Sequence, residues 1–422
     1  MTERQSDLAI YRLLEQELVP ALGCTEPIAF AFAAARAREL FGDMPTRIVV
    51  ACSLNLLKNC RSVVVPNTNG LVGIEAAVLA GLIGGNAKRS LEVLEGLTPW
   101  HLDDIQNLLS RRICKIEVLD SGLPLHLVVR YENEQSSCEV EIRDTHTNVV
   151  RMTKNGEDVF IGRSPVTDAA SSDECPLSLD LIFDFVEHGD IDPLHRLLAR
   201  QIRYNGDIAD EGMRHRYGVG IGPLLLLRDA SLEGKMKAYA AAASEARMCG
   251  AQLPVVINSG SGNQGIATSV PLIVYARECS VTEERLYRAL VLSNLLTLHQ
   301  KHAIGRLSAF CGGVSAAASS AAALTYLSGG SRMAIEATLT NALAVTSGII
   351  CDGAKPSCAA KIATAVDAAL TASRLALAQT DYLANTGLLG VSTEATIHRV
   401  GVIAREGMKG VDDVLAAMLS SK

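Results

Sequence analysis

The sequence predicts an α+β protein, with a predominantly helical C-terminal core domain and a β-containing N-terminal part that includes an antiparallel meander. Hydrophobic residues make up 48% of the chain but aromatic residues only 4%. Ala and small aliphatic side chains must therefore fill a large core, which favours closely packed helices. Alternating and β-branched segments gather between residues 113 and 161, whereas Ala-, Ser- and Leu-rich segments dominate after residue 178.

These patterns divide the 422 residues into three predicted parts. Residues 1–112 form an N-terminal α/β segment, residues 113–177 an antiparallel meander followed by a linker, and residues 178–422 a helical domain. The linker is assigned to residues 164–178, which are polar and contain Pro.

The N-terminal segment is expected to mix helices with short strands. Residues 7–18 have the periodicity of an amphipathic helix. Thr25 followed by Pro27 is typical of a helix start with Thr25 as the N-cap, and this Ala-rich helix is expected to run to Leu40. The remaining predicted elements are strands at 47–52 and 63–65, a turn at 67–70 and a helix at 71–83.

Strands are predicted in the second part and mainly helices in the third. Four strands separated by turn residues are expected at 116–119, 125–131, 138–143 and 148–152. The third part is expected to contain helices with polar faces at 179–217 and 231–249, a short strand at 253–258, and long helices with glycine-rich joints beyond Gly265.

Charge and hydropathy narrow the classes of function. The formal charge of −7 lacks the basic surplus that nucleic-acid binding needs. Residues 1–7 contain no apolar signal core, which predicts a cytoplasmic protein. The uncharged stretch 307–331 is long enough to span a bilayer, but its Ala, Ser and Gly content predicts a helix buried in protein. We therefore expect a small-molecule substrate, with no nucleic-acid or membrane partner.

The 11 cysteines are odd in number and irregularly spaced, which is unlike a disulfide framework. Most are expected to be small buried hydrophobic residues. Cys24 directly precedes a predicted helix, where the positive end of the helix dipole lowers a thiol pKa. From its position alone, Cys24 is either a reactive thiolate or an inert thiol.

Cys311, Cys351 and Cys358 lie at glycine-containing joints between predicted helices. They lack the closely spaced cysteine pairs that zinc sites usually have. Three thiols at helix ends fit an iron–sulfur cluster with one iron left for another ligand. The alternative is that all three are buried structural cysteines.

A glycine- and serine-rich turn lies between the strand predicted before it and the helix after it. Such a turn presents successive backbone N–H groups that suit a carboxylate or phosphate. Its residues are Ser259, Gly260, Ser261, Gly262, Asn263 and Gln264. We interpret it as a carboxylate site, the alternative being a turn without a ligand. His299 and His302 share a helix face but are a weak metal pair, and Lys301 either pairs with a carboxylate or is solvated.

These motifs resemble the oxygen-sensitive iron–sulfur L-cysteine desulfidases, which are relatives of the bacterial iron–sulfur L-serine dehydratases. The resemblance runs over nearly the whole chain. It is carried by residues 22–27, 258–265, 311–314 and 351–358. Lys58 and Asn59, followed by residues 64–70 with Asn67 among them, also resemble the family's N-terminal substrate segment.

The resemblance implies that Cys311, Cys351 and Cys358 ligate a [4Fe–4S] cluster and that Cys24 is the catalytic base. Some serine dehydratases cover the open iron with a Cys near the C-terminus, but this sequence has no Cys after Cys358. It is in this respect similar to the desulfidases. The ligand of the fourth iron is then left open: it is water, Cys24 or no ligand at all.

The implied reaction is β-elimination of L-cysteine to pyruvate, ammonia and sulfide without pyridoxal phosphate. Cys24 would take the α-proton, the open iron would bind the leaving sulfur, and the turn at 259–265, helped by Lys58 and Asn67, would hold the carboxylate. The same motifs also serve an enzyme acting on serine, threonine or another β-substituted amino acid. A non-catalytic iron–sulfur sensor and a structural protein without a cluster are further alternatives, and a homo-oligomer is left open.

Overall fold

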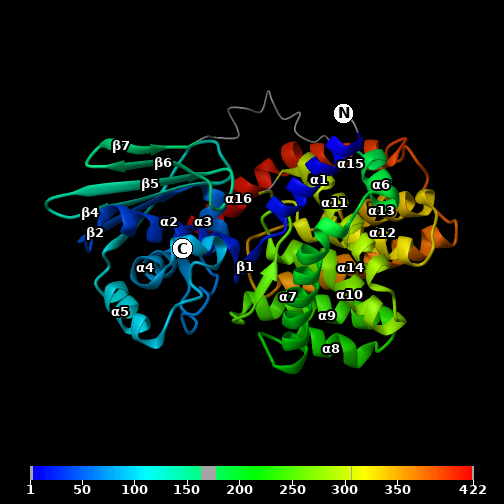
Figure 1. The fold of residues 1–422 in the computed structure, drawn as a ribbon, viewed down its shortest axis with the longest axis horizontal. Coiled ribbons are helices and arrows are strands. Elements are labelled where there is room, and N and C mark those ends of the chain that lie inside the picture. The colour runs from blue at the N-terminus through cyan, green and yellow to red at the C-terminus, as the bar shows by residue number, and fades with distance from the viewer. Residues whose placement is uncertain (1–2, 163–176, 306, 421–422) are drawn as a thin grey trace.

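The computed structural model describes residues 3–162, 177–305 and 307–420 and has two adjoining parts (Figure 1). One part is a sheet covered by helices on one face, and the other is a larger assembly of helices. The predicted α+β class is therefore confirmed. The predicted linker at 164–178 lies outside the described residues except for its last two positions.

The sheet has six strands in the order β3-β2-β4-β5-β6-β7. The strands are β2 (Arg47–Cys52), β3 (Cys114–Val118), β4 (His126–Glu132), β5 (Ser137–Arg143), β6 (Val149–Lys154) and β7 (Glu157–Ile161). The predicted antiparallel meander is confirmed for β4 to β7, but β3 pairs in parallel with β2. Because β2 lies between β3 and β4, the segments 1–112 and 113–177 share one sheet.

Helices from the N-terminal segment cover one face of this sheet (Figure 1). Helix α2 (Thr25–Phe41) packs on β4 and β5, and α4 (Gly73–Gly84) packs on α2. The buried Tyr131 of β4 donates a hydrogen bond to the carbonyl oxygen of Ala34 in α2, at 3.0 Å. The other helices here are α3 (Leu54–Cys60), the 3₁₀ helix η1 (Ala87–Glu92) and α5 (Pro99–Ser110).

The strand predicted at 63–65 is wrong, because only an isolated bridge between Val64 and Val72 forms there. Pro66 has no backbone N–H to donate to a ladder. Asn67 and Asn69 have φ angles of 58° and 53°, so the chain reverses immediately after the apolar run. The predicted turn at 67–70 is thus confirmed, and it prevents the preceding residues from extending into a strand.

The other described helices make up the helical part of the molecule and its junction with the sheet part. They are α1 (Glu3–Glu17), α6 (Leu179–His188), α7 (His195–Arg214), α8 (Ile221–Arg228), α9 (Leu232–Met248), α10 (Gly262–Cys279), α11 (Glu283–Ile304), α12 (Gly312–Leu327), α13 (Arg332–Thr346), α14 (Cys358–Leu377), α15 (Thr393–Val402) and α16 (Lys409–Ser420), with the short turns η2 (Asp192–Leu194) and η3 (Ile403–Gly407). Helix α12 contacts α10, α11, α13 and α14, and its Ala and Ser side chains are buried.

Helix α12 lies within the uncharged stretch 307–331 and is surrounded by protein, as the composition of the stretch predicts. None of the helices in the described ranges combines the length and apolar character needed to cross a membrane.

Two short contacts join the sheet part to the helical part. Strand β1 (Pro20–Leu22) pairs antiparallel with β8 (Pro254–Val256), which confirms the short strand predicted at 253–258. Helix α16 lies beside α3 at the same junction (Figure 1). Both contacts join residues that are far apart in the sequence, and the β1–β8 pair does so just before α2 and α10 begin.

Candidate active site

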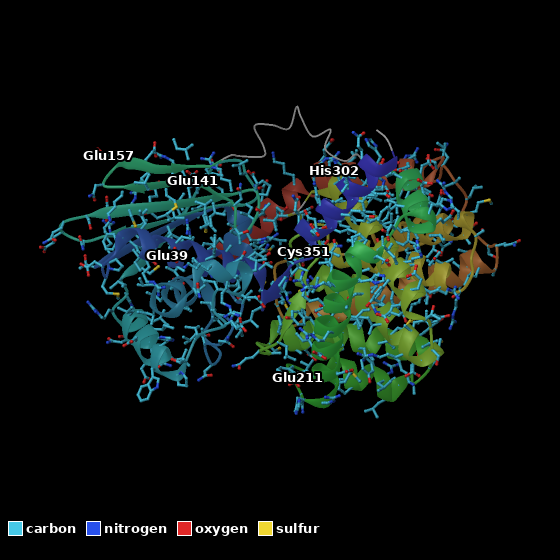
Figure 2. All side chains as sticks on the ribbon, in the orientation of Figure 1. Glu39, Glu141, Glu157, Glu211, His302 and Cys351 are labelled. Atoms are coloured by element: carbon cyan, nitrogen blue, oxygen red, sulfur yellow. The ribbon has the colours of Figure 1, made fainter. Side chains whose placement is uncertain are left out.

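A cavity lies at the junction of the two parts, and side chains from both of them line it. Figure 2 shows Cys351 at this junction. Nine of the residues singled out from the sequence line the cavity: Cys24, Asn59, Ser261, Asn263, Gln264, Lys301, Cys311, Cys351 and Cys358. Glu26 and Arg247, to which sequence reasoning gave no role, also line it.

Four helices begin at this cavity. Cys24 is the N-cap of α2, Ser261 of α10 and Cys311 of α12, while Cys358 is the first residue of α14. The N-cap predicted at Thr25 is thus off by one residue. Helix N-termini carry partial positive charge and unpaired N–H groups, so their convergence favours anionic groups in the cavity.

The three thiols predicted to bind a cluster come from two hydrogen-bonded loops and a helix start. The Cys311 N–H donates to the Ile349 carbonyl at 3.0 Å, and the Cys351 N–H donates to the Ala309 carbonyl at 2.6 Å. Burial, together with the neighbouring Cys351 and Cys358, raises the pKa of Cys311 to about 12. Burial also raises the pKa of Cys358. Such crowded thiols lose their protons when a metal coordinates them.

This donor set fits a four-iron cluster better than a single ion. Within the described ranges, no three His, Cys, Asp or Glu side chains are gathered closely enough to hold one metal ion. A [4Fe–4S] cluster is larger than an ion, so its cysteine ligands stand farther apart around it. Three thiols lining one buried cavity match a cluster that keeps one iron free of protein ligands.

Basic side chains lie beside the same thiols. Lys361 donates to the Ile350 carbonyl at 2.7 Å and forms an ion pair with Asp352. Burial opposes the charge of Asp352, but Lys361 and Lys355 outweigh it and lower the Asp352 pKa to about 2. Lys361 also lowers the pKa of Cys311 and Cys358, so it favours the thiolate forms that a cluster needs.

Cys24 forms a hydrogen-bonded pair with Glu26. Its Sγ donates to Glu26 Oε2 at 2.9 Å, and Asn59 donates to the other carboxylate oxygen at 3.2 Å. Burial raises the Cys24 pKa well above its usual value, and the charge of Glu26 raises it further. The lowered pKa expected from the helix dipole is therefore wrong, because desolvation and a neighbouring anion outweigh the partial charge of a helix end.

The pKa of Glu26 is lowered although the residue is buried. Burial alone would raise it, but the positive field of His146, the hydrogen bond from Cys24, its own backbone N–H and the charge of Arg247 together overcome that effect. Glu26 is therefore ionised and able to accept the proton that Cys24 already points toward it.

Three buried polar atoms of the cavity residues have no hydrogen-bond partner within the described ranges. They are Asn59 Oδ1, Arg247 Nε and Gln264 Oε1. Buried polar groups are almost always hydrogen-bonded, so three unpaired ones on residues that line one cavity favour a polar ligand there. Two acceptors and one cationic donor match the ammonium and carboxylate groups of an amino acid.

Two glycines make room for these side chains. A Cβ on Gly262 would lie 2.3 Å from Arg247 Nε, and a Cβ on Gly312 would lie 2.5 Å from the Gln264 amide carbon. Arg247 also donates to Asn263 Oδ1 at 3.2 Å. The polar face expected for the helix at 231–249 is wrong at its C-terminal end, where Arg247 is only 4% exposed.

The structure places the other candidates outside the cavity lining. Lys58 is paired with Asp412, and Asn67 donates to the Leu94 carbonyl at 3.0 Å. Ser259 lines a second cavity, which Lys301 shares with the first, and Gly260 lies in the turn between Ser259 and Ser261. His299 and His302 also line the second cavity. There, His299 Nε2 is hydrogen-bonded to Glu394 Oε2 at 2.7 Å.

All ten cysteines in the described ranges are free. Those expected to be structural lie outside the first cavity, and they are Cys52, Cys60, Cys114, Cys138, Cys249 and Cys279. Cys175 lies outside the described residues. Of the described ones, Cys52, Cys60 and Cys138 are buried as expected for most cysteines, whereas Cys114 and Cys249 are partly exposed and Cys279 is exposed.

Comparison with known proteins gives two findings. Residues 125–417 match the family model described as serine dehydratase alpha chain, a range that includes the three loop thiols but not Cys24. UPF0597 proteins of Lachnoclostridium phytofermentans, Finegoldia magna and Treponema denticola are 46%, 44% and 42% identical to this chain. These matches cover 96–97% of this chain and 96–99% of the relatives.

Proposed function

The chain belongs to the serine dehydratase alpha-chain family, a family of iron–sulfur lyases. We propose that within this family it is an L-cysteine desulfidase, the group of lyases that its sequence motifs resemble. The reaction is a β-elimination in which L-cysteine loses the α-proton and the β-sulfur as sulfide. The resulting enamine takes up water to give pyruvate and ammonia. Pyridoxal phosphate has no part in this proposal.

One observation carries the proposal. A thiol paired with a carboxylate, three further thiols and three unpaired polar atoms all belong to residues that line the same cavity. An elimination from an amino acid needs a base, a group that assists the leaving sulfur and contacts that fix the substrate's orientation. Each requirement has a matching set of side chains in this cavity.

Cys311, Cys351 and Cys358 would hold the [4Fe–4S] cluster that the family implies. When bound, the cluster supplies a Lewis acid for the leaving group. The leaving group develops negative charge, and residues of this chain favour anions at that place. They are Lys361, which lies beside the thiols, and the N-terminal residues of α12 and α14.

The base in this proposal is Cys24, and Glu26 is its proton acceptor. The thiol proton moves along the 2.9 Å hydrogen bond to the Glu26 carboxylate, and the thiolate then takes the α-proton. The negative charge only moves from oxygen to sulfur, so no additional charge is created in the buried site. Because the pKa of Cys24 is raised and that of Glu26 is lowered, thiol and carboxylate are the resting forms, and the thiolate forms only transiently during the reaction.

Substrate orientation is assigned to the unpaired polar atoms. Arg247 and the N-terminus of α10 suit the α-carboxylate, because both are positive and Arg247 is buried. Asn59 Oδ1 and Gln264 Oε1 are acceptors that suit the α-ammonium group. Holding both ends of the amino acid would turn its Cα–H toward Cys24.

A second candidate is L-serine dehydration at the same site, which the family description favours. The two reactions differ only in the leaving atom, sulfur or oxygen, so a direct comparison of substrates separates them. Full-length protein reconstituted anaerobically should receive either L-cysteine or L-serine without added pyridoxal phosphate. Sulfide and pyruvate would be measured for the first substrate, and pyruvate for the second.

We expect sulfide and pyruvate in equal amounts from L-cysteine, with a higher kcat/KM than for L-serine. Pyruvate from L-serine together with no sulfide from L-cysteine would replace the proposal by the dehydratase. A fully loaded cluster with neither product would contradict both and favour the sensor interpretation.

A further inference from the structure

A buried ion pair joins α16 to α3 across the junction of the two parts. Lys58 Nζ lies 2.5 Å from Asp412 Oδ1, although the two residues are far apart in the sequence. The Lys58 side chain is only 2% exposed and that of Asp412 is 18% exposed. Lys58 therefore has a fixed anionic partner, which is why it does not serve as a free cation for substrate.

The same two side chains also contact the loops that carry the cluster thiols. The second oxygen of Asp412 accepts a hydrogen bond from the Ala309 N–H at 3.0 Å. Lys58 Nζ donates a longer hydrogen bond, of 3.5 Å, to the carbonyl oxygen of Cys351. Ala309 is two residues before Cys311, so the pair reaches both thiol-bearing loops.

These contacts close a ring of hydrogen bonds. Asp412 accepts from Ala309, the Ala309 carbonyl accepts from the Cys351 N–H at 2.6 Å, the Cys351 carbonyl accepts from Lys58, and Lys58 donates back to Asp412. Beyond the ring, the Cys311 N–H donates to Ile349 at 3.0 Å. Removing one member leaves other buried polar groups of the ring without a partner.

We infer that Asp412 and Lys58 are positioning residues that hold the Cys311 and Cys351 loops at the spacing a [4Fe–4S] cluster requires. A cluster is rigid, so its affinity depends on how well the loops are fixed before it binds. The inference rests on the cluster that the family implies and not on which amino acid is the substrate.

The main test is Asp412→Asn in the full-length chain, which keeps the shape of the side chain but removes its charge. The measurement is the rate at which a chelator removes iron from the anaerobically reconstituted protein, followed by the loss of visible absorbance. Loss of such a supporting contact typically costs about 10- to 100-fold in metal affinity, so we expect iron to leave roughly tenfold faster.

Asp413→Asn is the matched control, because Asp413 is the next residue on α16 and is exposed. It should release iron at the wild-type rate. A double variant, Lys58→Met with Asp412→Leu, removes the ring without leaving a buried charge unpaired, which protects the fold. It should also release iron roughly tenfold faster than wild type. Wild-type rates in both ring variants would overturn the inference.

A measurement on the wild type covers the case in which the ring variants do not fold. Amide hydrogen exchange at Ala309 and Cys351 should be slow, because both N–H groups are donors within the ring. Exchange as fast as in an open loop would overturn the inference. None of these measurements uses substrate, so a firmly held cluster without desulfidase activity would contradict the proposed function alone.

Discussion

The two parts of the molecule contribute different chemistry to one cavity. The sheet part supplies Cys24, Glu26 and Asn59. Glu26 accepts hydrogen bonds from both Cys24 and Asn59. The helical part supplies the three cluster thiols, together with Arg247 and Gln264. The groups that would hold the cofactor thus come from one part and the proposed base from the other. Loss of the cluster and loss of proton transfer should therefore be separable by substitution.

The largest expected effect is in the helical part. Cys351→Ser should remove both the visible absorbance and the activity, because a serine hydroxyl is a poor replacement for a thiolate ligand of iron. Iron content per chain and sulfide release are the measurements. Cys279→Ser is the control, since Cys279 is exposed and outside the cavity, and it should keep both. Full iron content in Cys351→Ser would place the third ligand elsewhere.

Removing the proposed base tests the sheet part. Cys24→Ala should leave iron and absorbance unchanged but lower kcat by about 10²- to 10⁴-fold, the usual contribution of a general base. Cys60→Ala is the control, because Cys60 is also a buried thiol of this part but does not line the cavity. Normal turnover in Cys24→Ala would show that another group, with Glu26 the nearest, takes the α-proton.

Sequence reasoning located these cysteines because their neighbours are locally informative. Cys24, Cys311 and Cys358 all lie at helix starts, which Gly and Pro mark in the sequence. The strand at 47–52 and the helices after residue 178 also follow from local periodicity. What local patterns do not contain is pairing between distant segments, and the parallel contact of β3 with β2 was missed for that reason.

Contacts between distant segments also explain which residues of the site sequence reasoning missed. Arg247 lies in an Ala-rich helix and resembles a solvated cation until Gly262, from a separate turn, makes room for it in the interior. Lys58 was interpreted as a substrate ligand because its partner Asp412 lies near the other end of the chain. Burial and partner choice are properties of the packed molecule, so single-segment patterns do not reveal them.

A smaller effect is expected from Arg247, which lies in the helical part and is proposed to bind the substrate carboxylate. Arg247→Met should lower kcat/KM for L-cysteine at least about 30-fold, equal to about 2 kcal/mol, because a buried charged contact to the carboxylate is lost. Cysteamine, which lacks the carboxylate, should inhibit the variant and the wild type equally. Arg228→Met, an exposed change on α8, is the control. An equal loss of cysteamine binding would assign Arg247 to the fold of the cavity instead.

The smallest expected effect concerns the sheet part alone and leaves the cavity unchanged. Glu141 of β5 accepts hydrogen bonds from His126 at 2.8 Å and from Arg143 at 2.6 Å, and these contacts lower the Glu141 pKa despite its burial. A carboxyl whose pKa is lower in the folded state stabilises the fold above its unfolded pKa of about 4.3, and this stabilisation is lost as the pH falls through the folded value.

The urea midpoint of the cluster-free protein should therefore fall on acidification below about pH 4.5, and Glu141→Gln should make that fall shallower. At pH 6.5 the variant should be less stable by about 1 kcal/mol, because its hydrogen bonds no longer involve a charge. Glu157→Gln on the exposed strand β7 is the control (Figure 2). An unchanged acid slope in Glu141→Gln would mean that the pH dependence arises from other carboxyl groups with a lowered pKa, such as Glu26 and Asp352.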